Sequence, residues 1–167
     1  AGGGSVHFHY MISKSKGLFH KGFSQSGTTL NPWVIAENPL EKTKQIASLL
    51  GCSSQSTKEM VDCLKERPGK QIVETITTFQ PWLFNPFSPF AVVVDKWAED
   101  PLIPDHPYQL LKKKLVHSVP WIASHVNSEG LYPAAEFFSD EKYLDDIDKR
   151  WDDILPHILH YNETVNS

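Results

Sequence analysis

The sequence predicts an α/β fold with parallel strands, because strand signals and helix signals alternate along the chain. Two short apolar segments lie between turn residues: "KGLFHKGFSQSGTT" at 16–29, where the strand ends at Ser26, and "SVPWIASHV" at 118–126. The second segment has no polar alternation, so we expect a strand that is buried on both faces, as in parallel sheets.

The opening segment, "AGGGSVHFHYMIS", has three consecutive glycines, Gly2 to Gly4, ahead of apolar residues without a clear period. Glycines ahead of a helix are typical of a backbone that approaches a neighbouring segment closely. We therefore expect tight backbone packing at these glycines.

Residues 38–51 carry the signals of a helix. Asn38 stands at the N-cap position, Pro39 at the first helical position and Gly51 at the stop. Glu41 in the first turn suits the positive end of the helix dipole. The segment is the clearest helix in the sequence.

Residues 56–69 repeat this pattern with a capping box, in which Ser56 caps the helix and Glu59 stands three residues later. The segment ends at a Pro-Gly pair, which cannot continue a helix. A weaker helical pattern follows at 70–79.

Residues 81–107 hold six prolines interleaved with aromatic residues. The segment is too apolar for a disordered linker and too broken for helices, so we expect an ordered loop that forms a wall around one short strand, Val92 to Val94. Further helices are predicted at 108–116, 131–138 and 140–159, the last of them acidic and facing solvent.

Composition excludes several classes of function. The chain has 167 residues, 40% hydrophobic and 22% charged, with a formal net charge of −4. It fits one domain or a part of one. No basic stripe is available for nucleic acid, and no apolar run approaches the length of about 20 residues that crosses a bilayer.

Two short-range signals bear on the cellular compartment. Cys52 and Cys63 are the only cysteines, and their spacing allows either a disulfide that closes a short loop or two free thiols. Asn162 begins an N-x-T sequon, which is glycosylated when it is exposed in a secreted protein, although such sequons also occur by chance.

Glu129 lies just beyond the strand predicted at 118–126, where loops that leave a parallel sheet carry functional residues. An acid at the start of the helix predicted at 131–138 is the alternative interpretation. The close histidine pairs, His7 with His9 and His157 with His160, lack the geometry or the third ligand of a metal site, so no metal is expected.

Several motifs together resemble one family. "AGGGSVHFHYMISKSKGLFHKGFSQSGT" closely resembles the segment after the nucleophilic serine of type-B carboxylesterases, the cholinesterase and carboxylesterase family, and is most similar to the insect branch. "FSQSGTTLNPW", "CSSQSTKEMVDCL", "PLIPDHPYQLL" and "VPWIASHVNSEG" follow in the family's order. The resemblance implies a partial α/β-hydrolase fold, with residues 1–167 an internal portion of a single domain that lacks its N-terminal and C-terminal parts.

The resemblance assigns roles to individual residues. Glu129 matches the acid of a Ser-Glu-His triad, and Ala1 the residue whose backbone N–H serves the oxyanion hole. Ser26 resembles the serine beneath the triad acid, and an ordinary turn residue at the strand end is the alternative. The substrate pocket would include Trp33, for which a core tryptophan is the alternative, and by a looser match Phe87 and Phe90.

The resemblance implies a serine esterase that acts on small carboxylic esters without a cofactor. It also makes the disulfide between Cys52 and Cys63 the expected state, which favours a secreted glycoprotein over a cytoplasmic protein. Because nucleophile and base lie outside the sequence, residues 1–167 alone are expected to be inactive. The alternatives are a catalytically inactive adhesion protein of the cholinesterase type and a free-standing binding domain.

Overall fold

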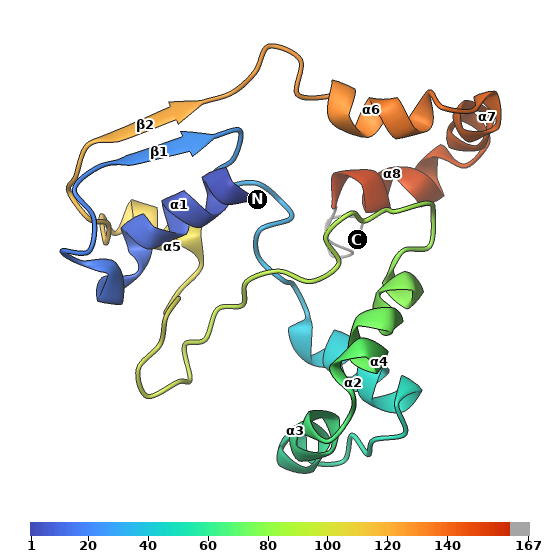
Figure 1. The fold of residues 1–167 in the computed structure, drawn as a ribbon, viewed down its shortest axis with the longest axis horizontal. Helices are drawn as coiled ribbons and strands as arrows, with labels where there is room; N and C mark the ends of the chain where they lie inside the picture. Colours follow the sequence, from blue (N-terminus) through green and yellow to red (C-terminus); the bar gives the residue numbers. More distant parts are fainter. Residues whose placement is uncertain (161–167) are drawn as a thin grey trace. The chain divides into compact units, whose positions relative to one another are not determined.

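A computed structural model describes residues 1–160 of the chain as two compact units (Figure 1). The first unit combines Ala1–Ile35 with Val92–Trp151, and the second combines Ala36–Ala91 with the residues from Asp152 onward. The predicted sequon at Asn162 lies outside the described residues. Each unit has its own set of packed side chains, so the two are described separately.

Each of the two strands in the described residues is followed by helices. The first unit contains α1 (Gly2–Met11), the 3₁₀ turn η1 (Ser13–Ser15), β1 (Gly22–Gln25), α5 (Pro107–Lys112), β2 (Trp121–Ser124), α6 (Leu131–Phe137) and α7 (Glu141–Lys149). The second contains α2 (Pro39–Leu49), α3 (Thr57–Lys65), α4 (Gly69–Glu74) and the 3₁₀ turn η2 (Thr75–Phe79). The helix α8 (Trp151–Leu159) begins at the boundary.

The strands β1 and β2 pair in parallel, which confirms the predicted strand positions and their orientation. Gly22 lies opposite Trp121, and Gln25 lies opposite Ser124. The ladder continues past the strand ends, because the Ser26 N–H donates to the Ser124 carbonyl oxygen at 2.9 Å. Both strands therefore end at the same edge of the sheet.

The prediction that the segment 118–126 is buried on both faces is wrong for the described residues. All four residues of β2 are exposed, and Ile122 keeps 64% of its surface accessible. A central strand is buried only when other elements pair with both edges and cover both faces. Within residues 1–160, β1 is the one strand paired with β2.

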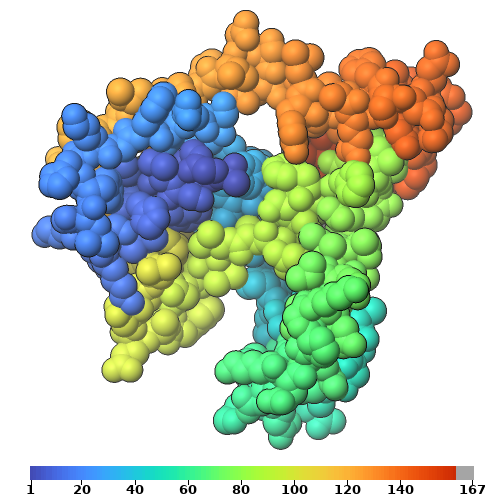
Figure 2. Space-filling model, viewed as in Figure 1, coloured from blue at the N-terminus to red at the C-terminus, as the bar shows by residue number. Residues whose placement is uncertain are grey.

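The glycines at the start of α1 form the close approach that the sequence predicts. A Cβ on Gly3 would lie 2.5 Å from the carbonyl oxygen of Gln25 and 2.8 Å from that of Gly27. In Figure 2 the dark blue atoms of α1 lie directly against the lighter blue atoms of the β1 segment. The backbone of α1 thus packs on the backbone at the end of β1.

A small apolar cluster, to which α1 contributes Phe8, holds the first unit together. Its members are Phe8, Ile12, Val34 and Ile103, with Trp33, Ile35 and Val94 packed against it. The strand predicted at Val92 to Val94 is reduced to a single bridge between Val92 and Ile35. The reason is local, because the Asp95 carboxylate accepts the backbone N–H groups of Leu102 and Ile103 and turns the chain into a loop.

In the second unit, the Cys52–Cys63 disulfide joins the end of α2 to α3 and packs with Ala47 and Met60. The predicted Ser56 cap is confirmed, since its hydroxyl accepts the Glu59 N–H. Asn38 does occupy the N-cap of α2, but its left-handed backbone, with φ of 49°, leaves its side chain without a capping hydrogen bond.

The helix predicted at 140–159 is two helices. Arg150 leaves the helical region, with φ of −128° and ψ of 34°, and separates α7 from α8. The expectation of a solvent-facing helix holds for α7, which has no buried residue, but not for α8, in which Ile154 is 1% exposed. The break separates a helix without buried residues from one that buries Ile154.

No helix in the described part of the chain is long and apolar enough to cross a membrane.

Alanine substitutions at neighbouring glycines test the close approach. Alanine favours a helix over glycine by about 1 kcal/mol, so Gly2→Ala, with nothing within 4 Å of its added Cβ, should not lower the free energy of unfolding. Gly3→Ala forces two backbone segments apart and should lower it by about 1–3 kcal/mol. Urea unfolding of the intact protein measures both, and equal stability of the two variants would contradict the packing described above.

Candidate functional site

The carboxyl ends of β1 and β2 bring two loops of the first unit together. Ser26 is the first residue after β1, and Glu129 lies in the turn that follows β2. In parallel sheets the loops at this edge are the usual place for functional side chains. Glu129 therefore occupies the place that its sequence position predicts.

The Glu129 carboxylate is held by two hydrogen-bond donors. Its Oε1 accepts the Val126 N–H at 2.9 Å, and the Ser26 side chain is a second donor. These bonds lower the pKa of Glu129, the Ser26 bond contributing most, followed by the Val126 bond, with the charge of His125 adding to them. Glu129 is thus kept ionised and in a fixed position, although it is exposed within the described residues.

The alternative role for Glu129, a helix cap, does not match the geometry. Gly130 is the N-cap of α6, and no side chain caps that end of the helix. The carboxylate instead closes its own turn through Val126. Its position depends on β1 and β2 rather than on α6.

Ala1 occupies the N-cap of α1, and its carbonyl oxygen accepts the Ser5 N–H at 3.0 Å. Next to it, Gly3 and Gly4 pack on residues 25–28, the segment that carries Ser26. The start of α1 and the Glu129 turn therefore both contact the residues that follow β1.

The predicted pocket residues belong to both units, and their surroundings are described for each unit separately. Trp33 is partly buried and packs on the core cluster of the first unit, as the core interpretation expects. Phe87 and Phe90 belong to the second unit, where Phe90 meets Phe79 edge-on and Phe87 meets His160 edge-on, each with ring centroids 5.1 Å apart. Both phenylalanines are more than 40% exposed.

The histidines of α1 have separate partners. Nδ1 of His7 accepts the Thr29 N–H at 3.2 Å, whereas Nδ1 of His9 lies 2.9 Å from the Ser15 hydroxyl. Across residues 1–160, no three His, Cys, Asp or Glu side chains converge into a possible metal site.

Sequence reasoning missed one part of this region. Ser24, which is 1% exposed, receives a hydrogen bond from Trp121, a residue 97 positions away. A serine inside a four-residue strand carries no local signal for such a contact. Only the register of the two strands could have indicated it.

The comparisons with known proteins agree on one family. The model of the carboxylesterase family matches residues 1–167. The chain is 41% identical over 165 residues to venom carboxylesterase-6 of Apis mellifera and 41% identical over 165 residues to a carboxylic ester hydrolase of Bombus ignitus. It is 38% identical over 167 residues to esterase FE4 of Myzus persicae.

These matches cover 99–100% of the chain but only 29–30% of each relative. The chain thus spans about three-tenths of the length of the curated relatives it matches. Because the match runs through the chain without interruption, both structural units fall within the family region.

Removal of the Ser26 hydroxyl tests the electrostatics of this site. Ser26→Ala deletes the bond that contributes most to the lowered pKa of Glu129, so that pKa should rise toward its ordinary value while the Val126 bond remains. A ¹³C NMR titration of the glutamate carboxyls in the intact protein measures the shift, with Glu129→Gln assigning the signal. An unchanged pKa in Ser26→Ala would show that Ser26 does not support the carboxylate.

Proposed function

The chain belongs to the carboxylesterase family, and on that premise we propose that the intact protein is a serine esterase whose triad acid is Glu129. The observation that carries the proposal is the carboxylate of Glu129 at the carboxyl edge of the sheet, ionised and held by Ser26 and Val126. Residues 1–167 are one internal portion of the esterase domain. They supply the acid and part of its support.

Ester hydrolysis by such a triad needs three groups in fixed order. A serine attacks the ester carbonyl, a histidine takes the serine proton and passes it to the leaving alcohol, and water then releases the acyl group. The serine precedes Ala1 and the histidine follows residue 167 in the intact protein. Residues 1–167 alone therefore have no esterase turnover.

Glu129 orients the histidine. A carboxylate bonded to one imidazole nitrogen leaves the other free to accept the serine proton, and its charge stabilises the imidazolium that forms. The Ser26 and Val126 bonds serve this role in two ways. They fix the carboxylate in space, and they lower its pKa so that it stays charged.

Ala1 contributes its backbone N–H to the oxyanion that forms during attack. This amide lies at the N-terminus of α1, where the helix dipole also favours negative charge. Small carboxylic esters are the substrate class. The reaction needs no metal or organic cofactor.

The protein passes through the secretory pathway. The Cys52–Cys63 disulfide supports this, because disulfides persist in oxidising compartments. The Apis mellifera relative is named a venom carboxylesterase. Asn162 is the glycosylation site.

Substitution of the acid tests the function in the intact protein. Glu129→Gln keeps the shape of the side chain but removes the charge, so kcat for a chromogenic short-chain ester should fall about 10³- to 10⁴-fold, as when other triads lose their carboxylate. Glu141→Gln, which neutralises an exposed carboxylate of α7, is the matched control and should stay within twofold of wild type.

Two results contradict this proposal. One is a Glu129→Gln protein with wild-type turnover, which would return Glu129 to a structural role. The other is an intact protein that neither hydrolyses esters nor reacts with a serine-directed phosphonate, which would point to a binding protein.

A further inference from the structure

A relay of two hydrogen bonds crosses from β2 through β1 to α1. The indole Nε1 of Trp121 donates to the Ser24 hydroxyl oxygen at 2.9 Å, and the Ser24 hydroxyl donates to the Gly3 carbonyl oxygen at 3.0 Å. Ser24 is 1% exposed, so water does not compete for these bonds. One buried hydroxyl thus joins three elements of the first unit.

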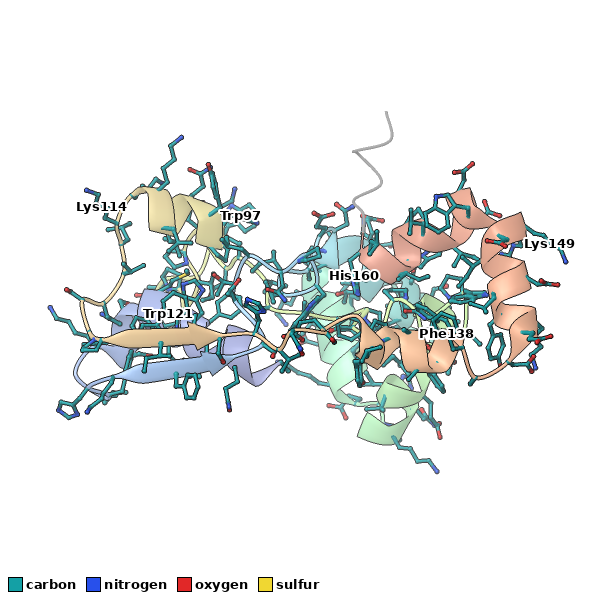
Figure 3. All side chains as sticks on the ribbon, turned by 90° about the horizontal axis from the view of Figure 1, so that it is seen from above. Trp97, Lys114, Trp121, Phe138, Lys149 and His160 are labelled. Carbon is teal, nitrogen blue, oxygen red and sulfur yellow. A yellow bond between two sulfur atoms is a disulfide. The ribbon has the colours of Figure 1, made fainter. Side chains whose placement is uncertain are left out.

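The strand register makes room for the relay. Trp121, at the start of β2 (Figure 3), lies opposite Gly22, which has no side chain to block the indole. The indole reaches past Gly22 to Ser24, two residues further along the same face of β1. A Cβ on Gly22 would lie 2.6 Å from the Tyr10 hydroxyl, so the Tyr10 side chain would have to shift to admit it.

A second contact from α1 fixes the indole plane. The His7 ring stacks on Trp121 with centroids 4.3 Å apart and an interplanar angle of 25°. His7 is 4% exposed, and its Nδ1 accepts the Thr29 N–H, which requires the unprotonated nitrogen. Burial lowers the pKa of His7 and so favours the same neutral form.

The relay contacts the segments that hold the proposed catalytic groups. Ser24 lies two residues before Ser26, which bonds to Glu129. Trp121 begins the strand that leads to the Glu129 turn, and Gly3 lies in the first turn of the helix that begins at Ala1. A displacement of α1 along the sheet would therefore break the relay.

We propose that Ser24 is a positioning residue, which together with Trp121 fixes the oxyanion-hole end of α1 relative to Glu129. This inference rests on the proposed esterase function. Ser24 touches neither substrate nor the reacting atoms. It acts through Gly3, because oxyanion donors stabilise the transition state only when they are held in place before the reaction.

The test uses the intact protein with Ser24→Ala, which removes both bonds, and Trp121→Phe, which removes one bond and keeps a ring against His7. Turnover is expressed per active site, titrated with a serine-directed phosphonate, so that unfolded protein does not count. We expect kcat per site to fall about tenfold in Ser24→Ala and about threefold in Trp121→Phe, while KM stays within twofold.

Tyr10→Phe is the matched control. The Tyr10 hydroxyl also links α1 to the β2 segment, donating to the Pro120 carbonyl oxygen at 2.7 Å, but it takes no part in the relay. This variant should lose stability toward urea and keep the wild-type kcat per site. A purely structural role for Ser24 predicts the same behaviour for all three variants.

The outcomes separate the two proposals. Suppose that wild type hydrolyses esters and that this activity depends on Glu129. If Ser24→Ala then keeps its kcat per site, or loses no more of it than Tyr10→Phe does, the positioning role is overturned and the esterase function stands. An intact protein without Glu129-dependent turnover overturns both. A selective loss of kcat per site in Ser24→Ala and Trp121→Phe establishes the role.

Discussion

The parallel pairing of β1 with β2 is the constraint on which the first unit depends. It joins segments nearly a hundred residues apart and sets the register that places Gly22 opposite Trp121. From this register follow the two contacts with functional meaning, the bond between Ser26 and Glu129 and the bond between Trp121 and Ser24. A slip by one residue would turn Trp121 and Ser24 to opposite faces of the sheet and remove the contact between them.

The glycines of α1 complement this pairing. Gly3 lets the helix backbone pack on the turn after β1, where any side chain would meet carbonyl oxygens. The same short distance lets the Ser24 hydroxyl reach the Gly3 carbonyl oxygen. Close packing and polar contact therefore have one cause, which is the absence of a Cβ at that position.

The exposed apolar face of β2 agrees with a chain that spans three-tenths of its relatives' length. The composition of this strand suits a central position in a sheet with neighbours on both sides. The second unit differs from the sheet, because Ala47 and Met60 pack there around the Cys52–Cys63 disulfide within a short stretch of sequence. Its internal packing depends on local contacts, whereas that of the sheet depends on distant ones.

The sequence by itself determined the α/β class, the positions of both strands and most helices, and the place of Glu129 beyond β2, because apolar patterns, caps and turn residues are local signals. It also indicated the Cys52–Cys63 pair through the family resemblance. Only the tertiary structure decided the break at Arg150, the loop at Asp95 that replaced a predicted strand, and the relay through Ser24. The relay depends on residues 97 positions apart, and hydrogen bonds across a strand register exist only after the chain has folded. The Asp95 loop and the Arg150 break depend on backbone hydrogen bonds and angles that the apolar pattern does not indicate.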